Sequence, residues 1–233
     1  MINDIKERIL FEDNHLIIVN KLSGELVQGD KSGDITLADE VKDYLKETYK
    51  KPGNVYLGIP HRLDRPTSGI VIYAKTEKAL KRLCEMFRTN EIKKYYWAVT
   101  DKAPDNTSGT LVHYMVRNTK QNKSIATPVE KQGSKLAKLS YKLLAASQRY
   151  FLLEIELHTG RHHQIRAQLA AIGLHIKGDL KYGFPRSNPD GGICLHARKV
   201  TFMHPVKKEP LVIIADPPHD VIWDAFMNAK PQD

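Results

Sequence analysis

The sequence predicts an α+β fold with a mixed, mainly antiparallel central sheet flanked by helices and loops. Short apolar runs of strand length are interleaved with amphipathic stretches of helical period, but they do not form regular βαβ repeats. No repeat period, no low-complexity segment and no stretch of linker composition divides the 233 residues. We therefore expect residues 1–233 to fold as a single domain, which is long enough to bury a sizeable core.

Two strands and two helices are expected in the first part of the chain. The runs HLIIVNK (His15–Lys21) and GIVIYAK (Gly69–Lys75) have the length and apolar content of buried strands. Between them, TLADEVKDYLKE has one apolar helical face, and Thr36 with Asp39 matches a capping box at its start. After the second strand, TEKALKRLCEMF is amphipathic, with Thr76 as its expected N-cap.

The middle of the chain combines a clear strand with a long basic segment. In KKYYWAVT the side chains alternate, so that Lys94, Tyr96 and Ala98 share one face. Residues 117–142 contain few large apolar side chains and carry seven basic residues against a single acid, Glu130. We interpret most of this segment as loop and hairpin with a basic face.

The last part of the chain is expected to add strands and two helices. YFLLEIEL, KVTFMHP and LVIIADPP are typical of strands, and DVIWDAFMNAK is typical of a closing helix. The stretch HHQIRAQLAAIG predicts a helix with Ile165, Leu169 and Ile172 facing inward and with Gly173 as its stop signal.

Composition and charge narrow the functional classes. The formal net charge is +9 and the pI is near 9.4, which favours a polyanionic partner, most commonly nucleic acid. No apolar run approaches the roughly 20 residues that span a bilayer, and the N-terminus lacks the apolar core of a signal peptide, so we expect a cytoplasmic protein without membrane contact. Cys84 and Cys194 form no CxxC pair, which argues against a disulfide or a zinc site.

The stretch HRLDRPTSG (His61–Gly69) places one acid, Asp64, in a tight loop between arginines. Such an acid can simply build an Asx-type turn. However, Arg62 cannot be buried without a partner, and Pro66 and Gly69 stiffen the loop, so that the carboxylate is held in place. Because reactive groups often lie on loops held by a scaffold, a functional role for Asp64 is the alternative.

A second group of candidates lies in TGRHHQIR (Thr159–Arg166) and in the predicted strand KKYYWAVT. Arg166 lies at the margin of the predicted apolar face, where it can reach the interior and pair with a carboxylate or, alternatively, cover apolar surface. His162 and His163 are adjacent and point to different sides of a helix, so we expect RNA contact, packing or hydrogen bonding rather than a metal site. Tyr96 is either an ordinary half-buried strand tyrosine or a ring that stacks on a base.

Together these segments resemble the RluA-type pseudouridine synthases. HRLDRPTSG is similar to the signature loop of that family, KYYWAV to its K-x-Y-x-A segment, and TGRHHQIR to its T-G-R-x-H-Q-I-R segment. GLHIKGDLKYG and LHARKVTFMHP match two further blocks in the same order. The resemblance extends from about Ile9 to Pro217. Leu22 stands where the entry segment of the family usually has a proline, and that departure touches no catalytic group.

The resemblance implies an isomerase that converts uridine to pseudouridine in structured ribosomal or transfer RNA, with no cofactor and no metal. It implies that Asp64 is the catalytic acid, that Arg166 keeps it ionised, and that Tyr96 stacks on the detached uracil. Arg62 is expected to enter the RNA stack where the base has left, and Ile165 to form an apolar wall against the base. Further RNA contacts are expected from His61, Lys94, Arg161 and His163.

The resemblance also suggests that the basic segment 117–142 grips phosphate, whereas charge alone leaves a solvated lysine-rich hairpin as the alternative. Because the chain starts close to the first strand of the catalytic domain, we expect no N-terminal S4 domain, and we expect a monomer. Two rival functions remain open: a binding module that grips RNA without catalysis, and a hydrolase that releases the free base.

Overall fold

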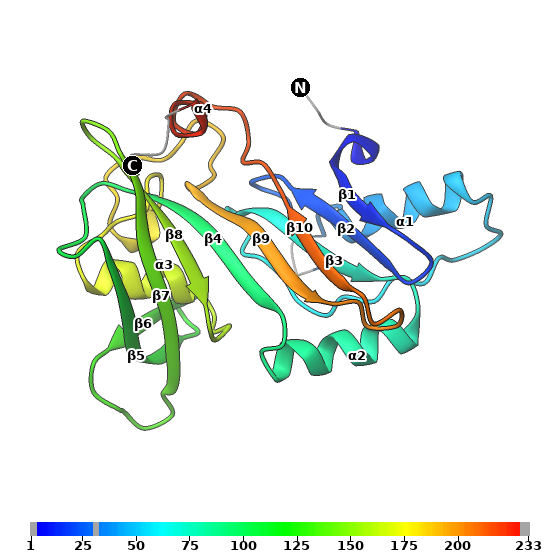
Figure 1. Ribbon diagram of the computed structural model, residues 1–233, viewed down its shortest axis with the longest axis horizontal. Coiled ribbons are helices and arrows are strands. Elements are labelled where there is room, and N and C mark those ends of the chain that lie inside the picture. The colour runs from blue at the N-terminus through cyan, green and yellow to red at the C-terminus, as the bar shows by residue number, and fades with distance from the viewer. Residues whose placement is uncertain (1–3, 30–32, 229–233) are drawn as a thin grey trace. The chain divides into compact units, whose positions relative to one another are not determined.

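The computed structural model describes residues 4–29 and 33–228, which divide into two compact units (Figure 1). Unit 1 comprises Met1–Ile92 and Ala197–Asp216, and unit 2 comprises Lys93–His196 and Pro217–Asp233. Each unit combines a mainly antiparallel sheet with helices, which confirms the predicted α+β class. That the two units form a single domain stays a prediction. Within the described residues, no helix has the length and apolar character needed to cross a membrane.

Unit 1 contains a sheet in the order β1-β2-β3-β9, with β10 paired to β9. Its strands are β1 (Ile9–Glu12), β2 (Leu16–Lys21), β3 (Ser68–Ala74), most of β9 (Leu195–Met203) and β10 (Pro210–Ile214). Its helices are the 3-10 helix η1 (Ile5–Arg8) and the α-helices α1 (Leu37–Thr48) and α2 (Glu77–Arg88). The pairs β1–β2, β2–β3 and β9–β10 are antiparallel.

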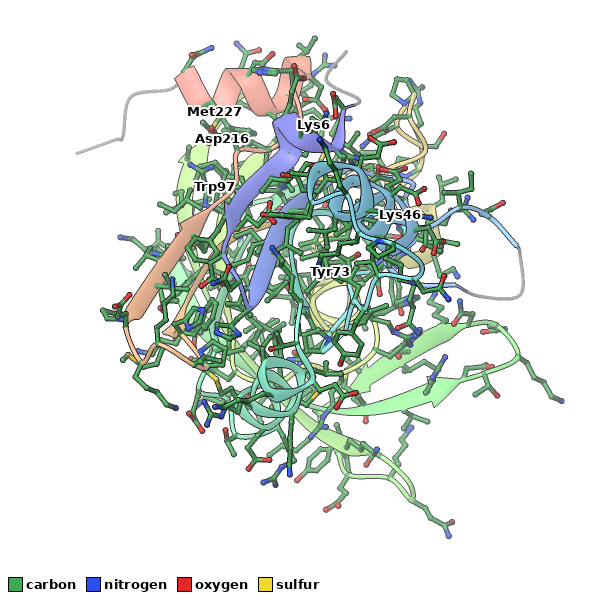
Figure 2. The ribbon with its side chains drawn as sticks, turned by 90° about the vertical axis from the view of Figure 1, so that its right-hand side faces the viewer. Lys6, Lys46, Tyr73, Trp97, Asp216 and Met227 are labelled. Carbon is green, nitrogen blue, oxygen red and sulfur yellow. The ribbon has the colours of Figure 1, made fainter. Side chains whose placement is uncertain are left out.

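The two predicted strands at the centre of unit 1 are confirmed and form its core. They pair from Leu16 opposite Ala74 to Lys21 opposite Gly69. Their apolar side chains are buried on both faces of the sheet, as continuous apolar runs predict. Tyr73, labelled in Figure 2, is fully buried, and its hydroxyl donates a hydrogen bond of 3.1 Å to the carbonyl of Val27.

The two predicted helices of unit 1 are confirmed together with their caps. The side-chain oxygen of Thr36 accepts from the amide of Asp39, and the Asp39 carboxylate accepts from the amide of Thr36, so the capping box is complete. The hydroxyl of Thr76 accepts from the amide of Ala79 at the start of α2, which packs on β3. These contacts satisfy amides that have no partner inside the helix.

Unit 2 contains a five-stranded antiparallel sheet in the order β4-β8-β7-β5-β6. The strands are β4 (Lys93–Thr100), β5 (Ser108–Asn118), β6 (Lys123–Thr127), β7 (Lys135–Ala146) and β8 (Phe151–Leu157). The helices are α3 (Gln164–Ala171), the 3-10 helix η2 (Leu180–Tyr182) and α4 (Val221–Asn228). Helix α3 packs against β5 and β6, as Figure 1 shows.

The basic segment 117–142 was only partly predicted. The expected hairpin exists between β5 and β6, whereas residues 135–142, which were not predicted as a strand of their own, belong to β7 and pair with β5 and β8. Ala137, Leu139 and Tyr141 of β7 are buried and alternate with Lys138, Ser140 and Lys142. This is the period-2 pattern of a half-buried strand, and the high lysine content of the segment obscured it.

Helix α3 begins later than predicted. His163 is its N-cap in the left-handed region (φ 52°), so the helix starts at Gln164 rather than at His162. Ile165 and Leu169 are buried as expected, whereas Ile172 lies after the last turn and is 40% exposed, so its inward placement is wrong. The helix ends before Gly173 (φ 79°), which confirms the stop signal.

The late elements are present with shifted ends. Strand β9 starts before the predicted KVTFMHP, and β10 ends at Ile214, before the predicted end at Pro218. Helix α4 confirms the closing helix up to Asn228, and residues 229 and 230 of the prediction lie outside the described residues. Trp223 and Phe226 of this helix pack in an apolar cluster of unit 2.

Candidate active site

The loop that carries Asp64 is fastened to β2 by a buried lysine of unit 1. Lys21 is fully buried, and its Nζ donates three hydrogen bonds to main-chain carbonyls. The acceptors are Leu22 (2.9 Å), Arg65 (3.0 Å) and Thr67 (2.7 Å). Because two of these acceptors lie in the three residues after Asp64, the main chain beside the carboxylate is fixed from inside the unit.

Further contacts hold the same loop. The amide of Thr67 donates to the carbonyl of Asp64 (3.0 Å), which closes a turn around the acid. The amide of Gly24 donates to the carbonyl of Arg65 (2.8 Å), and the Arg65 Nε donates back to the Gly24 carbonyl (2.9 Å). The Asp64 side chain itself is partly exposed. Main-chain groups close this turn, whereas an Asx-type turn uses the carboxylate, so the Asx alternative stays a prediction.

The burial of Lys21 changes its pKa. Desolvation lowers the pKa of Lys21 to about 8, although the carboxylates of Glu25 and Asp64 act to raise it. At neutral pH the ammonium form still dominates, and its three N–H donors match the three carbonyls. The structure thus places a buried cation within the electrostatic reach of Asp64.

The two residues before Leu63 differ in their environment. The Nε2 of His61 accepts a hydrogen bond from the amide of Ile72 (2.8 Å), and its ring stacks on Phe87 with centroids 4.5 Å apart. That ring holds the start of the loop against β3 and α2. Arg62, in contrast, is exposed. An exposed arginine beside the acid suits the predicted entry into an RNA stack, which stays a prediction.

Tyr96 lies on β4 of unit 2 and is 9% exposed. The predicted face is confirmed, because Lys94, Tyr96 and Ala98 are all buried while Tyr95 and Trp97 are only partly buried. Burial lowers the pKa of Lys94, which favours its neutral form compared with a lysine in water.

Arg166 is buried on α3 and binds a carboxylate of its own unit. Its Nε donates to Asp179 Oδ2 (2.7 Å) and its Nη2 to Asp179 Oδ1 (2.8 Å). Arg166 is 5% exposed and Asp179 is 1% exposed, so the alternative of a surface arginine is wrong. The guanidinium also lies 5.0 Å from the ring centroid of Tyr182.

The histidines before α3 form a hydrogen-bonded stack. The rings of His162 and His163 are 3.8 Å apart, with Ser124 bound to His162 Nδ1 (2.9 Å) and the Tyr182 hydroxyl bound to His163 Nδ1 (3.0 Å). Ile165 is buried, and Arg161 is exposed with its Nε on the carbonyl of Leu136. No group of histidine, cysteine or carboxylate side chains among the described residues is arranged to bind a metal.

Sequence reasoning missed Lys21, Asp179 and Tyr182. Lys21 lies two residues after the end of the apolar run LIIV, within the predicted strand. A lysine buried there needs acceptors, so this position was a usable signal. Asp179 and Tyr182 lie in GDLKYG, a block noted only for its resemblance. Asp64 belongs to unit 1 and Arg166 to unit 2, so their pairing stays a prediction.

Comparison with known proteins identifies the family. Residues 15–171 match the family model described as RNA pseudouridylate synthase. An uncharacterized RNA pseudouridine synthase of Chlorobaculum parvum is 34% identical over 245 residues, which cover 94% of this chain and 73% of the relative. The ribosomal large subunit pseudouridine synthase D of Zymomonas mobilis is 30% identical over 228 residues, which cover 94% of this chain and 71% of the relative.

Solved structures show the same fold. The human RNA pseudouridylate synthase domain containing 4 superposes with a TM-score of 0.80, covering 98% of this chain and 96% of that chain at 22% identity. The family model spans well over half of the sequence, and the relatives are matched along most of its length. The chain therefore belongs to the RluA-type family of RNA pseudouridine synthases, which are isomerases.

Proposed function

We propose that this enzyme isomerises uridines of large-subunit ribosomal RNA and that Asp64 is the residue that acts on the ribose. The target is inferred from similar proteins named ribosomal large subunit pseudouridine synthase C and D. The observation that carries the role of Asp64 is its loop, in which the buried ammonium of Lys21 binds the carbonyls of Arg65 and Thr67. A carboxylate whose adjoining main chain is held this firmly is suited to meet a substrate atom in one orientation.

The proposed reaction needs no added group. The N1–C1′ glycosidic bond of uridine breaks, the uracil turns over, and C5 bonds to C1′; C5 loses its proton and N1 gains one. The target nucleotide must first be extruded from its stack, as in other enzymes that act on a base. As an anion, Asp64 then either attacks C1′ or takes the 2′ proton of the ribose to give a glycal.

The remaining site residues have supporting roles in this proposal. Arg166 keeps Asp64 ionised through charge-assisted hydrogen bonds. Tyr96 stacks on the detached uracil and assists removal of the C5 proton. Arg62 fills the space that the extruded base leaves, and Ile165 forms part of the apolar wall against the base. The low exposure of Tyr96 and Ile165 and the high exposure of Arg62 are compatible with these roles.

The experiment uses C5-tritiated transcripts of large-subunit ribosomal RNA and of transfer RNAs. The wild-type enzyme is expected to release tritium from the ribosomal transcript and to leave every base attached to its ribose. Asp64→Asn keeps the shape of the side chain and removes its charge, so it should bind the same transcript within about threefold of wild type and release no tritium. Asp43→Asn, at an exposed position of α1, is the matched control and should remain active.

Each outcome separates the proposal from its rivals. Tritium release by Asp64→Asn would remove Asp64 from the mechanism. Free uracil in the wild-type reaction would identify a hydrolase, and RNA binding without any tritium release would identify a binding module. Release from transfer RNA alone would overturn the ribosomal target and leave the reaction in place.

A further inference from the structure

The block GDLKYG (Gly178–Gly183) takes no part in the reaction described above, yet its residues surround Arg166. Asp179 and Tyr182 both contact the guanidinium, one through hydrogen bonds and the other through its ring. We propose that this block is a clamp that orients Arg166, with Asp179 as the positioning residue. The inference rests on the proposed function, because it assigns a purpose to the orientation of Arg166.

The bond between Asp179 and Arg166 fixes both position and rotation. Asp179 binds the edge of the guanidinium formed by Nε and Nη2, with both carboxylate oxygens engaged. Such a two-point contact defines the plane of the guanidinium, which a single contact does not. The end of the guanidinium between Nη1 and Nη2 lies outside this contact and has the geometry to bind a second carboxylate. Asp179 thus determines which edge Arg166 offers to a reacting group.

The other face of the clamp is the ring of Tyr182, and its hydroxyl is anchored to β6. The hydroxyl accepts from the amide of Ser124 (2.8 Å) and donates to the carbonyl of the same residue (3.1 Å). The Nδ1 of His163 lies 3.0 Å from the same oxygen. The ring therefore cannot turn away from Arg166 without breaking contacts to both the sheet and the N-cap of α3.

The glycines of the block explain how the chain brings both side chains to one point. Gly178 has φ +87°, and a Cβ there would lie 2.7 Å from Asn188 and from the carbonyl of Gly192. Gly183 has φ +105°, and a Cβ there would lie 2.8 Å from the His175 ring. Both positions need glycine, because other residues rarely adopt these angles and have no room. Between them, the short helix η2 brings Asp179 to the Nε–Nη2 edge of the guanidinium and the Tyr182 ring to 5.0 Å from its Cζ.

The test measures how strongly Asp179 acts through Arg166. Single-turnover tritium release from the large-subunit transcript gives the rate constant, and filter binding gives the Kd of the RNA. Asp179→Asn is expected to lower the rate constant by about 100-fold, because a misplaced reacting group costs on this order, and to change the Kd by less than about threefold. In the Arg166→Lys background, where no two-point contact exists, Asp179→Asn should lower the rate less than about threefold further.

Controls separate positioning from folding. Asp101→Asn removes a carboxylate of the same unit that binds His175 and should leave the rate within about threefold of wild type. Far-UV circular dichroism and the thermal midpoint report whether each variant is folded. If Asp179→Asn does not fold, Tyr182→Phe keeps the ring and removes the hydroxyl anchor. Its expected effect is a rate loss of about 3- to 10-fold that is likewise not additive with Arg166→Lys.

The clamp would be overturned, and the proposed function would stand, if the rate losses of Asp179→Asn and Arg166→Lys were additive in folded variants. Equal rates for Asp179→Asn and wild type would have the same consequence. A wild-type enzyme that releases no tritium from any transcript overturns the proposed function and the clamp together. Losses that appear only in the Kd would instead assign Asp179 to RNA binding and also contradict the clamp.

Discussion

Lys21 donates a hydrogen bond of 2.7 Å to the carbonyl of Thr67, which lies 46 residues later in the chain. The contact joins the end of β2 to the loop that carries Asp64, and both partners are buried. A long-range bond between a buried ammonium and the main chain fixes a loop more firmly than the turn chemistry of the loop alone. The position of the proposed catalytic acid therefore depends on a residue that takes no part in the chemistry.

Replacing Lys21 by methionine tests this dependence. Lys21→Met keeps an unbranched side chain of similar length but leaves three carbonyls without their donor, so the loop should relax. We expect the single-turnover rate of pseudouridine formation to fall by about 10- to 100-fold, with the RNA Kd changed by less than about threefold.

A second lysine of unit 1 provides the control. The side chain of Lys75 is 8% exposed and binds Glu12 (2.6 Å) rather than the loop. Lys75→Met should lower stability without a comparable loss in the rate of the folded enzyme. Equal rate losses in both variants would mean that general destabilisation, and not the loop, explains the effect.

The lowered pKa of Lys21 predicts a pH dependence of stability. The pKa is about 8 in the folded state against about 10.5 in the unfolded chain, so between these values the unfolded chain binds more protons. Stability therefore rises with pH in this window. The free energy of unfolding of wild type minus that of Lys21→Met should increase by up to about 3 kcal/mol between pH 8 and pH 10.5, measured by urea denaturation. A constant difference would contradict the lowered pKa.

Alanine substitutions at two glycines distinguish the stability lost through backbone strain from the stability lost through steric overlap. Gly69 has φ +112°, and a Cβ there would lie 2.5 Å from the main-chain N and O of Ala197; Gly24 has φ +90° with nothing within 4 Å. Gly24→Ala should lower the free energy of unfolding by about 1–2 kcal/mol, because alanine is strained at this backbone angle. Gly69→Ala should lower it by about 1–3 kcal/mol more than Gly24→Ala does, because β9 must also move to make room for the Cβ. Urea denaturation measures both, and equal losses would contradict the close approach.

Much of unit 1 could be predicted because its signals are local. The apolar runs of β2 and β3 and the caps Thr36 and Thr76 each act within a few residues of the sequence. In unit 2, β7 was missed because its many lysines obscured the alternation of the buried Ala137, Leu139 and Tyr141 with polar residues. Ile172 was misplaced because α3 ends at Ala171, so the helical period no longer applies there.

In the candidate site, too, residues with a local sequence signal could be predicted and long-range contacts could not. Asp64, Tyr96 and Arg166 could be proposed because each lies in a recognisable block. Their supports could not be proposed, since the contacts from Lys21 to Thr67 and from Arg166 to Asp179 join residues that no short pattern connects. A buried charge in an apolar run indicates that acceptors exist, but only the fold shows which ones.

The basic segment predicts the salt dependence of RNA binding. Six of its seven basic residues are exposed on β5, β7 and the connecting turns: Arg117, Lys120, Lys131, Lys135, Lys138 and Lys142. If about five of them contact phosphates, log Kd against log salt concentration should have a slope of magnitude about 4, because each contact releases about 0.7–0.9 counterions. Filter binding of the large-subunit transcript between about 50 and 200 mM salt measures the slope.

Paired charge removals locate the contacts. Lys138 and Lys142 lie on the face of β7 opposite the buried Ala137 and Leu139, so Lys138→Gln with Lys142→Gln should reduce the slope by about 2 and leave the single-turnover rate at saturating RNA unchanged. Lys46→Gln with Lys81→Gln removes two exposed charges from α1 and α2 as the control; Lys46 is labelled in Figure 2. Because both pairs change the net charge equally, a general loss of attraction would lower both slopes alike. If β7 contacts phosphates, the slope falls for the Lys138/Lys142 pair and stays at the wild-type value for the Lys46/Lys81 pair. Equal slopes for the two pairs would favour a solvated lysine-rich hairpin.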